Sequence, residues 1–345
     1  MTKNCGPASA GWINIAQGFG DFGNRNITGA YLRTFAHLMI IGDSVHEARR
    51  FRTKVRVLGR SESAQLTQTS HVLSPDSALT PYILGVVLAL LLAFMVFNAV
   101  RKDRREYRDF KRLRSTKRRQ KMFRKWVLQS FLNFGGAAVV VLLLTSQYVP
   151  LFLDAVNAWG FVADARGAFA ESGWLGPAIV AAFVILLAGG AVLGIVLARS
   201  ETEVPAIGDV QALLPRNRAE LKYGAALAIN AGVVEELLFR LALPVLIFAV
   251  SGSAVAAVVA SIVIFGMLHV YQGAAGIIGA VIMGAAFMTI YLATGSIVVA
   301  IIVHALFDLR SLVLIPVVVF KVHKELGSGA PPRTATKVDV PPLVA

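Results

Sequence analysis

Cysteine is almost absent from this sequence. Only one of the 345 residues is a cysteine, Cys5. A single cysteine excludes an intrachain disulfide and a zinc site built from cysteines. The usual metalloprotease spacing HExxH, which gives one helix two ligands and a base, is also absent. Any chemistry must therefore come from other side chains in another arrangement.

Acidic residues are also scarce, and the imbalance is local. The chain has 20 Asp and Glu against 34 Lys and Arg, a formal net charge of +14. Residues 101–126 alone hold fourteen Lys and Arg against three acids, which is +11 of that total. A basic segment between two apolar blocks is typical of a cytoplasmic loop attracted to anionic lipid headgroups. We therefore expect membrane lipid as a partner of 101–126 and expect no nucleic acid.

Hydrophobic residues make up 56% of the chain, above the roughly 45–50% of soluble domains. They lie in long blocks, and about 20 apolar residues are enough to cross a bilayer as a helix. The sequence thus predicts an all-α, polytopic transmembrane helix bundle of about seven spans. The predicted spans are residues 81–100, 127–149, 174–198, 223–250, 255–270, 275–294 and 297–320.

The blocks also predict a division of the chain. We expect an N-terminal tail of unknown role (1–79), three spans with the basic loop (80–200), a core of four spans (201–322) and a C-terminal tail (323–345). The loop 150–172 is poor in Lys and Arg, so 101–126 and the C-terminus are predicted to be cytoplasmic. The Ala-, Val-, Gly- and Arg-rich composition suits a GC-rich bacterium, which predicts the plasma (inner) membrane.

Ionisable residues mark the last four spans as the site. The first three spans have none away from their ends, and a charge at mid-bilayer costs roughly 2.5–3.5 kcal/mol. Such residues therefore face a bundle interior or a water-filled cavity. The last four spans contain Glu235, Glu236, Arg240, His269, His304, Asp308 and Arg310.

The spacing of these residues assigns partners within each helix. Glu236 and Arg240 are four residues apart, so they share a face and can pair. Glu235 points about 100° away from Glu236 and is left free. His304 and Asp308 also share a face, so Asp308 could orient His304 or share its work.

This set can support hydrolysis by water. Burial disfavours the charged form of a carboxylate, which makes Glu235 a usable general base. Two imidazoles, those of His269 and His304, can hold a water or donate to a developing oxyanion. Cys5 is remote and Ser261 has no evident base beside it. We therefore expect an activated water to attack an amide without a covalent intermediate.

Three motifs carry a family resemblance. In order, and inside predicted spans, they follow the patterns EExxxR, FxxxH and HxxxD. They begin at Glu235, Phe265 and His304. This region, roughly 220–310, resembles the CPBP family (CAAX proteases and bacteriocin-processing proteins, also called Abi), whose best-known eukaryotic relative is the type II CAAX prenyl endopeptidase. The resemblance implies an intramembrane endopeptidase with a peptide or protein substrate in or at the membrane.

The resemblance also implies roles. Glu235 corresponds to the base that activates water, and His269 to the residue that holds that water. His304 and Asp308 correspond to the oxyanion-stabilising pair. The prenyl endopeptidases carry Asn at the position of Asp308, and an ionised aspartate can only accept a hydrogen bond, so we expect Asp308 to orient His304. Supporting positions are Glu236, Arg240 and Phe265.

Three alternatives stay open. Relatives are often described as metalloproteases, and Glu235, His269 and His304 would be a plausible zinc set, although we favour no cofactor. A proton-coupled transporter would also place acids and histidines in spans, but it predicts internal repeats, and none is visible. A non-catalytic peptide-binding or immunity protein of the same fold would keep every motif, and only an activity measurement separates it.

Overall fold

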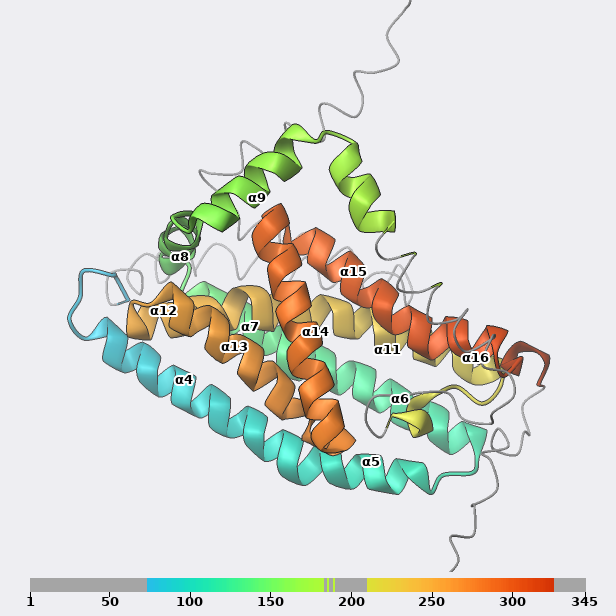
Figure 1. The fold of residues 1–345 in the computed structure, drawn as a ribbon. Helices are drawn as coiled ribbons and strands as arrows, with labels where there is room; N and C mark the ends of the chain where they lie inside the picture. The colour runs from blue at the N-terminus through green and yellow to red at the C-terminus, as the bar shows by residue number, and fades with distance from the viewer. Residues whose placement is uncertain (1–72, 183–184, 186–188, 190–209, 326–345) are drawn as a thin grey trace, which may run out of the picture. The chain divides into compact units, whose positions relative to one another are not determined.

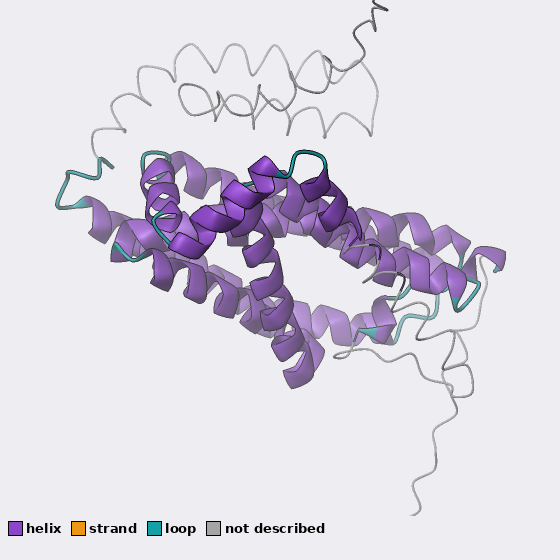
Figure 2. Cartoon of the chain, turned by 45° about the horizontal axis from the view of Figure 1, so that its top comes forward, coloured by secondary structure: helices purple, strands orange, loops and turns teal. Residues whose placement is uncertain are grey.

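The computed structural model describes residues 73–182, 185, 189 and 210–325. All regular secondary structure in these residues is helical (Figures 1 and 2). In the first half, α4 (Thr80–Phe97) continues through π-helical residues Asn98–Asp103 into α5 (Arg104–Lys111). Next, α6 (Thr116–Ser130) continues through the π-helical residues Phe131–Gly135 into α7 (Gly136–Leu144). Two shorter helices follow, α8 (Tyr148–Asn157) and α9 (Gly160–Glu171).

The second half contains the helices that bear the motifs. Helix α11 (Arg218–Glu236) runs through a π-helical turn, Leu237–Ala242, into α12 (Leu243–Ser251). Helices α13 (Ala254–Leu268) and α14 (Gly273–Thr294) are joined by the 3₁₀ turn His269–Gln272. The last helices are α15 (Ile297–Leu309) and α16 (Ile315–Val318), with π-helical residues Arg310–Leu314 between them. Single 3₁₀ turns lie at Gln211–Leu213 and Val322–Lys324.

Four helical stretches are long and apolar enough to cross a membrane, namely Thr80–Lys111, Thr116–Leu144, Ala254–Thr294 and Ile297–Val318. The all-helical architecture is confirmed, but the described residues show four such stretches and not the predicted seven. Predicted spans 255–270 and 275–294 fall in one stretch, which reverses at His269–Gln272 so that α13 packs against α14. Most of predicted span 174–198 lies outside the described residues, as does nearly all of the tail 1–79.

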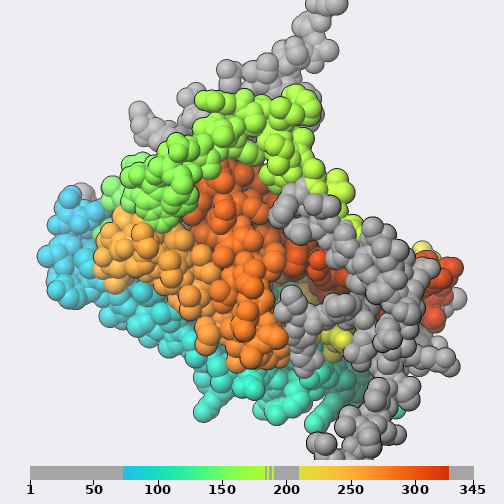
Figure 3. Space-filling view, in the orientation of Figure 1, coloured from blue at the N-terminus to red at the C-terminus, as the bar shows by residue number. Residues whose placement is uncertain are grey.

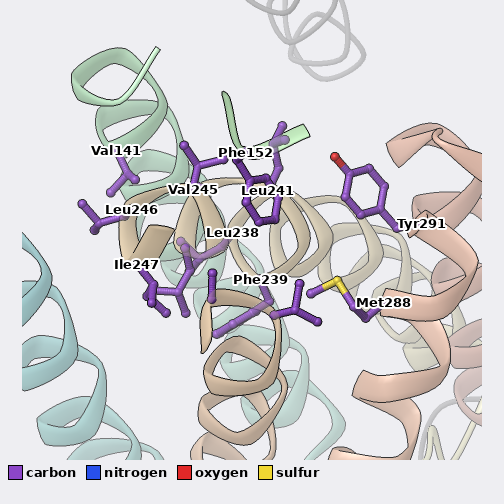
Figure 4. Close-up of a cluster of buried hydrophobic side chains, with 14 of the residues drawn as sticks. Val141, Phe152, Leu238, Phe239, Leu241, Val245, Leu246, Ile247, Met288 and Tyr291 are labelled. Carbon is purple, nitrogen blue, oxygen red and sulfur yellow. The ribbon is translucent and has the colours of Figure 1, made fainter. Parts of the chain in front are cut away.

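The predicted span 223–250 is helical but is not among the four. It lies within the continuous helix 218–251, which has Glu235, Glu236 and Arg240 in its middle. Phe239 and Leu246 of this helix are almost completely buried, in the apolar cluster of Figure 4. Met288 and Tyr291 of α14 point toward the same cluster. The charged helix is therefore the interior element of the bundle.

The outer helices present apolar side chains outward. In Figure 3, α13 and α14 (orange) lie on the visible face beside the blue-to-cyan α4 and α5. Val259 of α13, Ile282 of α14 and Leu90 of α4 are more than half exposed. Contiguous exposed apolar surface on long helices is what lipid contact requires.

The basic segment 101–126 was predicted to be a loop, but most of it is helical. It is helical on both sides of residues 112–115, because α4–α5 ends at Lys111 and α6 begins at Thr116. One of its arginines, Arg119, is fully buried, with Nε 3.1 Å from an oxygen of Glu220 at the start of α11. Its Nη2 donates to the carbonyls of Ala212 and Leu214. Arg119 therefore fastens the entry of α11 to α6.

Short capped turns join the remaining helices. Gly252 and Gly295 adopt positive φ (69° and 65°), a conformation that glycine reaches without a Cβ clash. The next residues, Ser253 and Ser296, cap the following helices by accepting from Ala256 N and Val299 N. The two turns lie in the short gaps between predicted spans 223–250 and 255–270 and between 275–294 and 297–320.

Candidate active site

Helices α11 and α15 meet at backbone contact distance. A Cβ added to Gly232 would lie 2.8 Å from the backbone nitrogen of Ala305. One at Gly224 would lie 2.9 Å from the carbonyl oxygen of Leu312, in the π-helical residues that follow α15. Glycine is thus required at both crossings, because any side chain would push the helices apart. The contact places Glu236, one turn beyond Gly232, beside His304.

Glu236 is the centre of a buried polar chain. The Nδ1 of His304 donates to Glu236 Oε1 at 2.8 Å, and Arg240 Nη2 lies 3.1 Å from the same oxygen. The side chains of Glu236 and Arg240 have no exposed surface. The predicted Glu236–Arg240 pair therefore forms, and it also holds a histidine of another helix.

Asp308 lies on the opposite side of the His304 ring. Its Oδ2 is 3.7 Å from His304 Nε2, which is beyond hydrogen-bond distance. The two ring nitrogens thus face two carboxylates, and only the Nδ1 contact, with Glu236, is a hydrogen bond. In this geometry the hydrogen bond that orients His304 is the one to Glu236, and the orienting role of Asp308 stays a prediction.

Two phenylalanines enclose the buried charges. The guanidinium carbon of Arg240 lies 4.6 Å from the ring centroid of Phe265 and 5.8 Å from that of Phe287. Phe287 stacks on His304 with centroids 4.5 Å apart and an interplanar angle of 20°. Cation–π attraction compensates part of the desolvation of Arg240. The FxxxH motif predicts a role for Phe265. No motif marks Phe287, which cannot be distinguished in the sequence from other aromatic residues in apolar helices.

His269 has a defined tautomer. Its Nδ1 lies 2.8 Å from the carbonyl oxygen of Phe265, and a carbonyl can only accept. Nδ1 therefore carries the proton, and the lone pair of Nε2 is left to accept from a water. Three residues earlier in the chain, α13 packs closely on α14, and a Cβ on Gly266 would lie 3.1 Å from the backbone nitrogen of Val281.

Glu235 is available, as its spacing predicts. It occupies the last turn of α11, is half-buried, and makes no hydrogen bond or ion pair with another described residue. It interacts electrostatically with His304, Asp308, Glu236 and Arg240, so it belongs to the same cluster. The structure thus brings all the predicted site residues together and leaves Glu235 unpaired among them.

Tyr271 is a site residue that the sequence did not suggest beyond its place in a turn. Its ring stacks on His269 with centroids 6.0 Å apart, and it interacts electrostatically with Glu235 and Asp308. Gln272 Nε2 donates to its hydroxyl oxygen at 2.9 Å, which leaves the hydroxyl proton for another acceptor. The only feature of the sequence that could have pointed to Tyr271 is its position, two residues after the motif histidine His269.

Among the described residues, no group of three His, Cys, Asp or Glu side chains is arranged to hold a metal ion. Zinc binding by Glu235, His269 and His304 stays a prediction for experiment, and the proposed mechanism uses no metal.

Residues 218–310 match the family model described as type II CAAX prenyl endopeptidase Rce1-like. This part of the chain is a domain of that family. The endopeptidase domain runs from the start of α11 to the end of α15 and includes all three motifs. Its family hydrolyses peptide bonds, which confirms the class of enzyme that the sequence predicts. No curated protein and no solved structure matched the chain. The family and the four apolar stretches together indicate an integral membrane protein.

Proposed function

We propose that this protein is an intramembrane endopeptidase in which Glu235 activates a water against a peptide bond of a membrane-associated peptide or protein. The observation that carries the proposal is the buried chain His304–Glu236–Arg240 beside Glu235. It fixes one histidine and uses the charge of the second glutamate, while Glu235 has no ion-pair partner among the described residues. An unpaired carboxylate beside an oriented imidazole is the arrangement that general-base hydrolysis requires.

In the proposed step, the Nε2 lone pair of His269 accepts a hydrogen bond from the water and orients it. Glu235 takes a proton from the water, and the remaining hydroxide oxygen bonds to the peptide carbonyl carbon. The carbonyl π electrons move to oxygen, and the oxyanion accepts a hydrogen bond from Nε2–H of a doubly protonated His304. The carbon–nitrogen bond then breaks, and Glu235 returns its proton to the leaving amine.

Asp308 is proposed as a positioning residue in this step. Its Oδ2 lies 3.7 Å from Nε2 of His304, so its charge favours a proton at that nitrogen. The proton on Nδ1 is kept by Glu236. The two carboxylates together favour the form of His304 that can donate to an oxyanion.

We further propose that the chain crosses a bacterial plasma membrane about seven times, with residues 101–126 and the C-terminus in the cytoplasm. Most of the cations of 101–126 are exposed at the end of the α4–α5 stretch and the start of α6, where anionic headgroups would lie. This placement supports contact of the segment with acidic lipid.

The test is cleavage of a peptide panel, including prenylated CAAX peptides, by purified protein in detergent. We compare wild type with Glu235→Gln and His304→Ala, each with and without a chelator, and use the exposed Glu171→Gln as the matched carboxylate control. Loss of cleavage in both site variants, with the control and the chelated wild type active, supports the glutamate mechanism. Loss on chelation rejects the metal-free mechanism. Equal cleavage by all variants rejects the assignment, and absence of cleavage favours the peptide-binding or transporter alternatives.

A further inference from the structure

The third motif of this chain ends in an aspartate, and this residue leaves the proposed oxyanion short of a hydrogen-bond donor. In the proposed step, one donor is Nε2–H of His304. An asparagine at position 308 could supply a second donor, whereas an ionised Asp308 can only accept. Sites that stabilise an oxyanion commonly combine two donors. A second donor in this protein must therefore come from another side chain.

The hydroxyl group of Tyr271 has a proton to offer. Gln272 Nε2 donates to the Tyr271 oxygen at 2.9 Å, so the amide occupies an acceptor position of that oxygen. Among the described residues, none accepts a hydrogen bond from the Tyr271 hydroxyl. A tyrosine hydroxyl has one proton to donate. In Tyr271 this proton is available to a group that enters the site.

The position of Tyr271 directs its hydroxyl group to the reacting atoms. The residue lies in the 3₁₀ turn His269–Gln272, and its half-buried ring stacks on that of His269 with centroids 6.0 Å apart. It interacts electrostatically with Glu235 of α11 and Asp308 of α15. The proposed base, the residue that orients water and the aspartate of the third motif thus all lie near Tyr271.

The ring and hydroxyl of Tyr271 are held before substrate arrives. Tyr107 of α5 meets the ring edge to face, with centroids 5.4 Å apart. The Gln272 amide that contacts the hydroxyl passes over Gly276, where an added Cβ would lie 3.0 Å from Gln272 Oε1. Gly273 ends the turn at φ 80°, a conformation that favours glycine. A donor fixed in this way needs little reorganisation when charge develops, which is the condition for strong oxyanion stabilisation.

We propose that Tyr271 is a catalytic residue whose hydroxyl group donates a hydrogen bond to the oxyanion, alongside His304, in place of an asparagine at position 308. The proposal rests on the proposed function and adds a residue to its mechanism. The tyrosine O–H bond stays intact throughout the step. The hydrogen bond strengthens as the carbonyl oxygen gains charge, and it weakens again when the carbon–nitrogen bond breaks.

The first experiment removes only the hydroxyl group. Tyr271→Phe keeps the ring that packs between His269 and Tyr107, so we expect kcat to fall about 100-fold with little change in KM. The matched control is Tyr223→Phe, which deletes the same atom from a half-buried tyrosine of α11 outside the candidate site. Equal kcat values of Tyr271→Phe and Tyr223→Phe would overturn the proposal.

A second variant separates donation to the oxyanion from a structural role. Asp308→Asn places an amide donor in the site, so Tyr271→Phe should cost less than about tenfold in kcat when it is combined with Asp308→Asn. A tyrosine that merely supports the turn would be needed equally in both backgrounds. The same loss of kcat with aspartate and with asparagine at position 308 would therefore reject the assignment.

Gln272 provides a test that leaves the tyrosine in place. Gln272→Glu replaces the amide that donates to the Tyr271 oxygen by a carboxylate that can only accept. The carboxylate should capture the hydroxyl proton, so we expect kcat to fall nearly as far as in Tyr271→Phe. Gln211→Glu adds the same charge at an exposed residue and serves as the control. Full activity of Gln272→Glu would contradict the proposed direction of the hydrogen bond.

Binding of a transition-state analogue separates this proposal from the proposed function. Calorimetry measures the Kd of a phosphinic peptide, in which an anionic tetrahedral phosphorus group replaces the scissile amide. We expect a Kd about tenfold higher or more for Tyr271→Phe than for wild type and Tyr223→Phe, which supports the donor even if no peptide of the panel is cut. Absence of binding by wild type overturns the proposal. If wild type cleaves peptides but all three proteins bind the analogue equally, only the role of Tyr271 fails and the proposed function stands.

Discussion

Nδ1 of His304 donates to Oε1 of Glu236 across the contact between α15 and α11, at 2.8 Å. The acceptor oxygen also faces Arg240, so one fully buried carboxylate serves two partners from two helices. The charge of Glu236 is thus engaged by His304 and Arg240, whereas the adjacent Glu235 has no such partner among the described residues. In the proposed mechanism, Glu236 therefore holds His304, and Glu235 stays available for water.

Neutralising Glu236 tests that division. Glu236→Gln keeps an oxygen that can accept from His304 but leaves the buried charge of Arg240 unpaired, which destabilises a fold by about 3–5 kcal/mol. We expect a lower unfolding temperature in detergent and a loss of peptide cleavage. Adding Arg240→Met should recover much of the stability, because it removes the orphaned charge. The control is Glu106→Gln, whose partly exposed pair with Lys125 should contribute less than about 1 kcal/mol. Similar stability of Glu236→Gln and wild type would contradict the buried pair.

The Gly232 contact is the second test. A Cβ at this position would lie 2.8 Å from the backbone nitrogen of Ala305, so Gly232→Ala must separate α11 from α15. Overpacking of this kind costs about 1–3 kcal/mol. Cleavage should fall as well, because the separation lengthens the Glu236–His304 hydrogen bond. Thermal unfolding and kcat give the two readouts.

The control for Gly232 is Gly136→Ala in α7. No atom lies within 4 Å of a Cβ there, so removal of glycine flexibility should leave the protein as stable or stabilise it by up to about 1 kcal/mol. Equal behaviour of the two alanine variants would show that α11 and α15 are not in backbone contact.

The sequence predicts which residues gather at the candidate site, but it does not predict all of their contacts. Glu235, His269 and His304 stand out because each is an ionisable side chain in an apolar helix. The i,i+4 rule also predicts the Glu236–Arg240 pair, because both residues lie on one helix. It cannot predict the Glu236–His304 contact, which joins residues 68 apart through a helix crossing set by Gly232.

The composition of the basic segment, residues 101–126, does not show which of its cations are buried. Arg119 is one of fourteen Lys and Arg in 101–126, and nothing local distinguishes it from its exposed neighbours. Its burial depends on Glu220, which is 101 residues away, and on the ring of Phe110, which lies 4.2 Å from its guanidinium carbon. The packing of the turn at Tyr271 against α5 is hidden for the same reason.

Arg119 provides the third prediction. Arg119→Met leaves the Glu220 carboxylate buried without its partner, so we expect a destabilisation of about 3–5 kcal/mol. The pair lies at the entry of α11, away from the His304 hydrogen bond, so kcat per folded molecule should stay near the wild-type value. Denaturant unfolding in detergent measures the first quantity and active-site titration the second. The exposed Arg118→Met is the control, and a stability loss of equal size there would refute the role of the pair.

Membrane orientation gives the fourth prediction. Cys5→Ser removes the single native cysteine, so one cysteine can then be placed at a chosen exposed site. In intact bacterial cells, a membrane-impermeant maleimide should label Asp164→Cys of α9 and should not label Arg114→Cys of the basic segment. Both must react after the membrane is permeabilised. The reverse pattern in intact cells would invert the proposed topology.

Asp308 is the last test, because it stands where prenyl endopeptidases carry asparagine. As a positioning residue it should be replaceable by the residue of those relatives, since an asparagine amide can donate to an oxyanion directly. We expect Asp308→Asn to retain cleavage. Asp308→Ala, which can neither donate nor favour a proton on Nε2 of His304, should lower kcat by on the order of 100-fold with little change in KM. If asparagine inactivates the enzyme as fully as alanine, the carboxylate itself takes part in proton transfer, and the single-base mechanism centred on Glu235 must be revised to a two-carboxylate one.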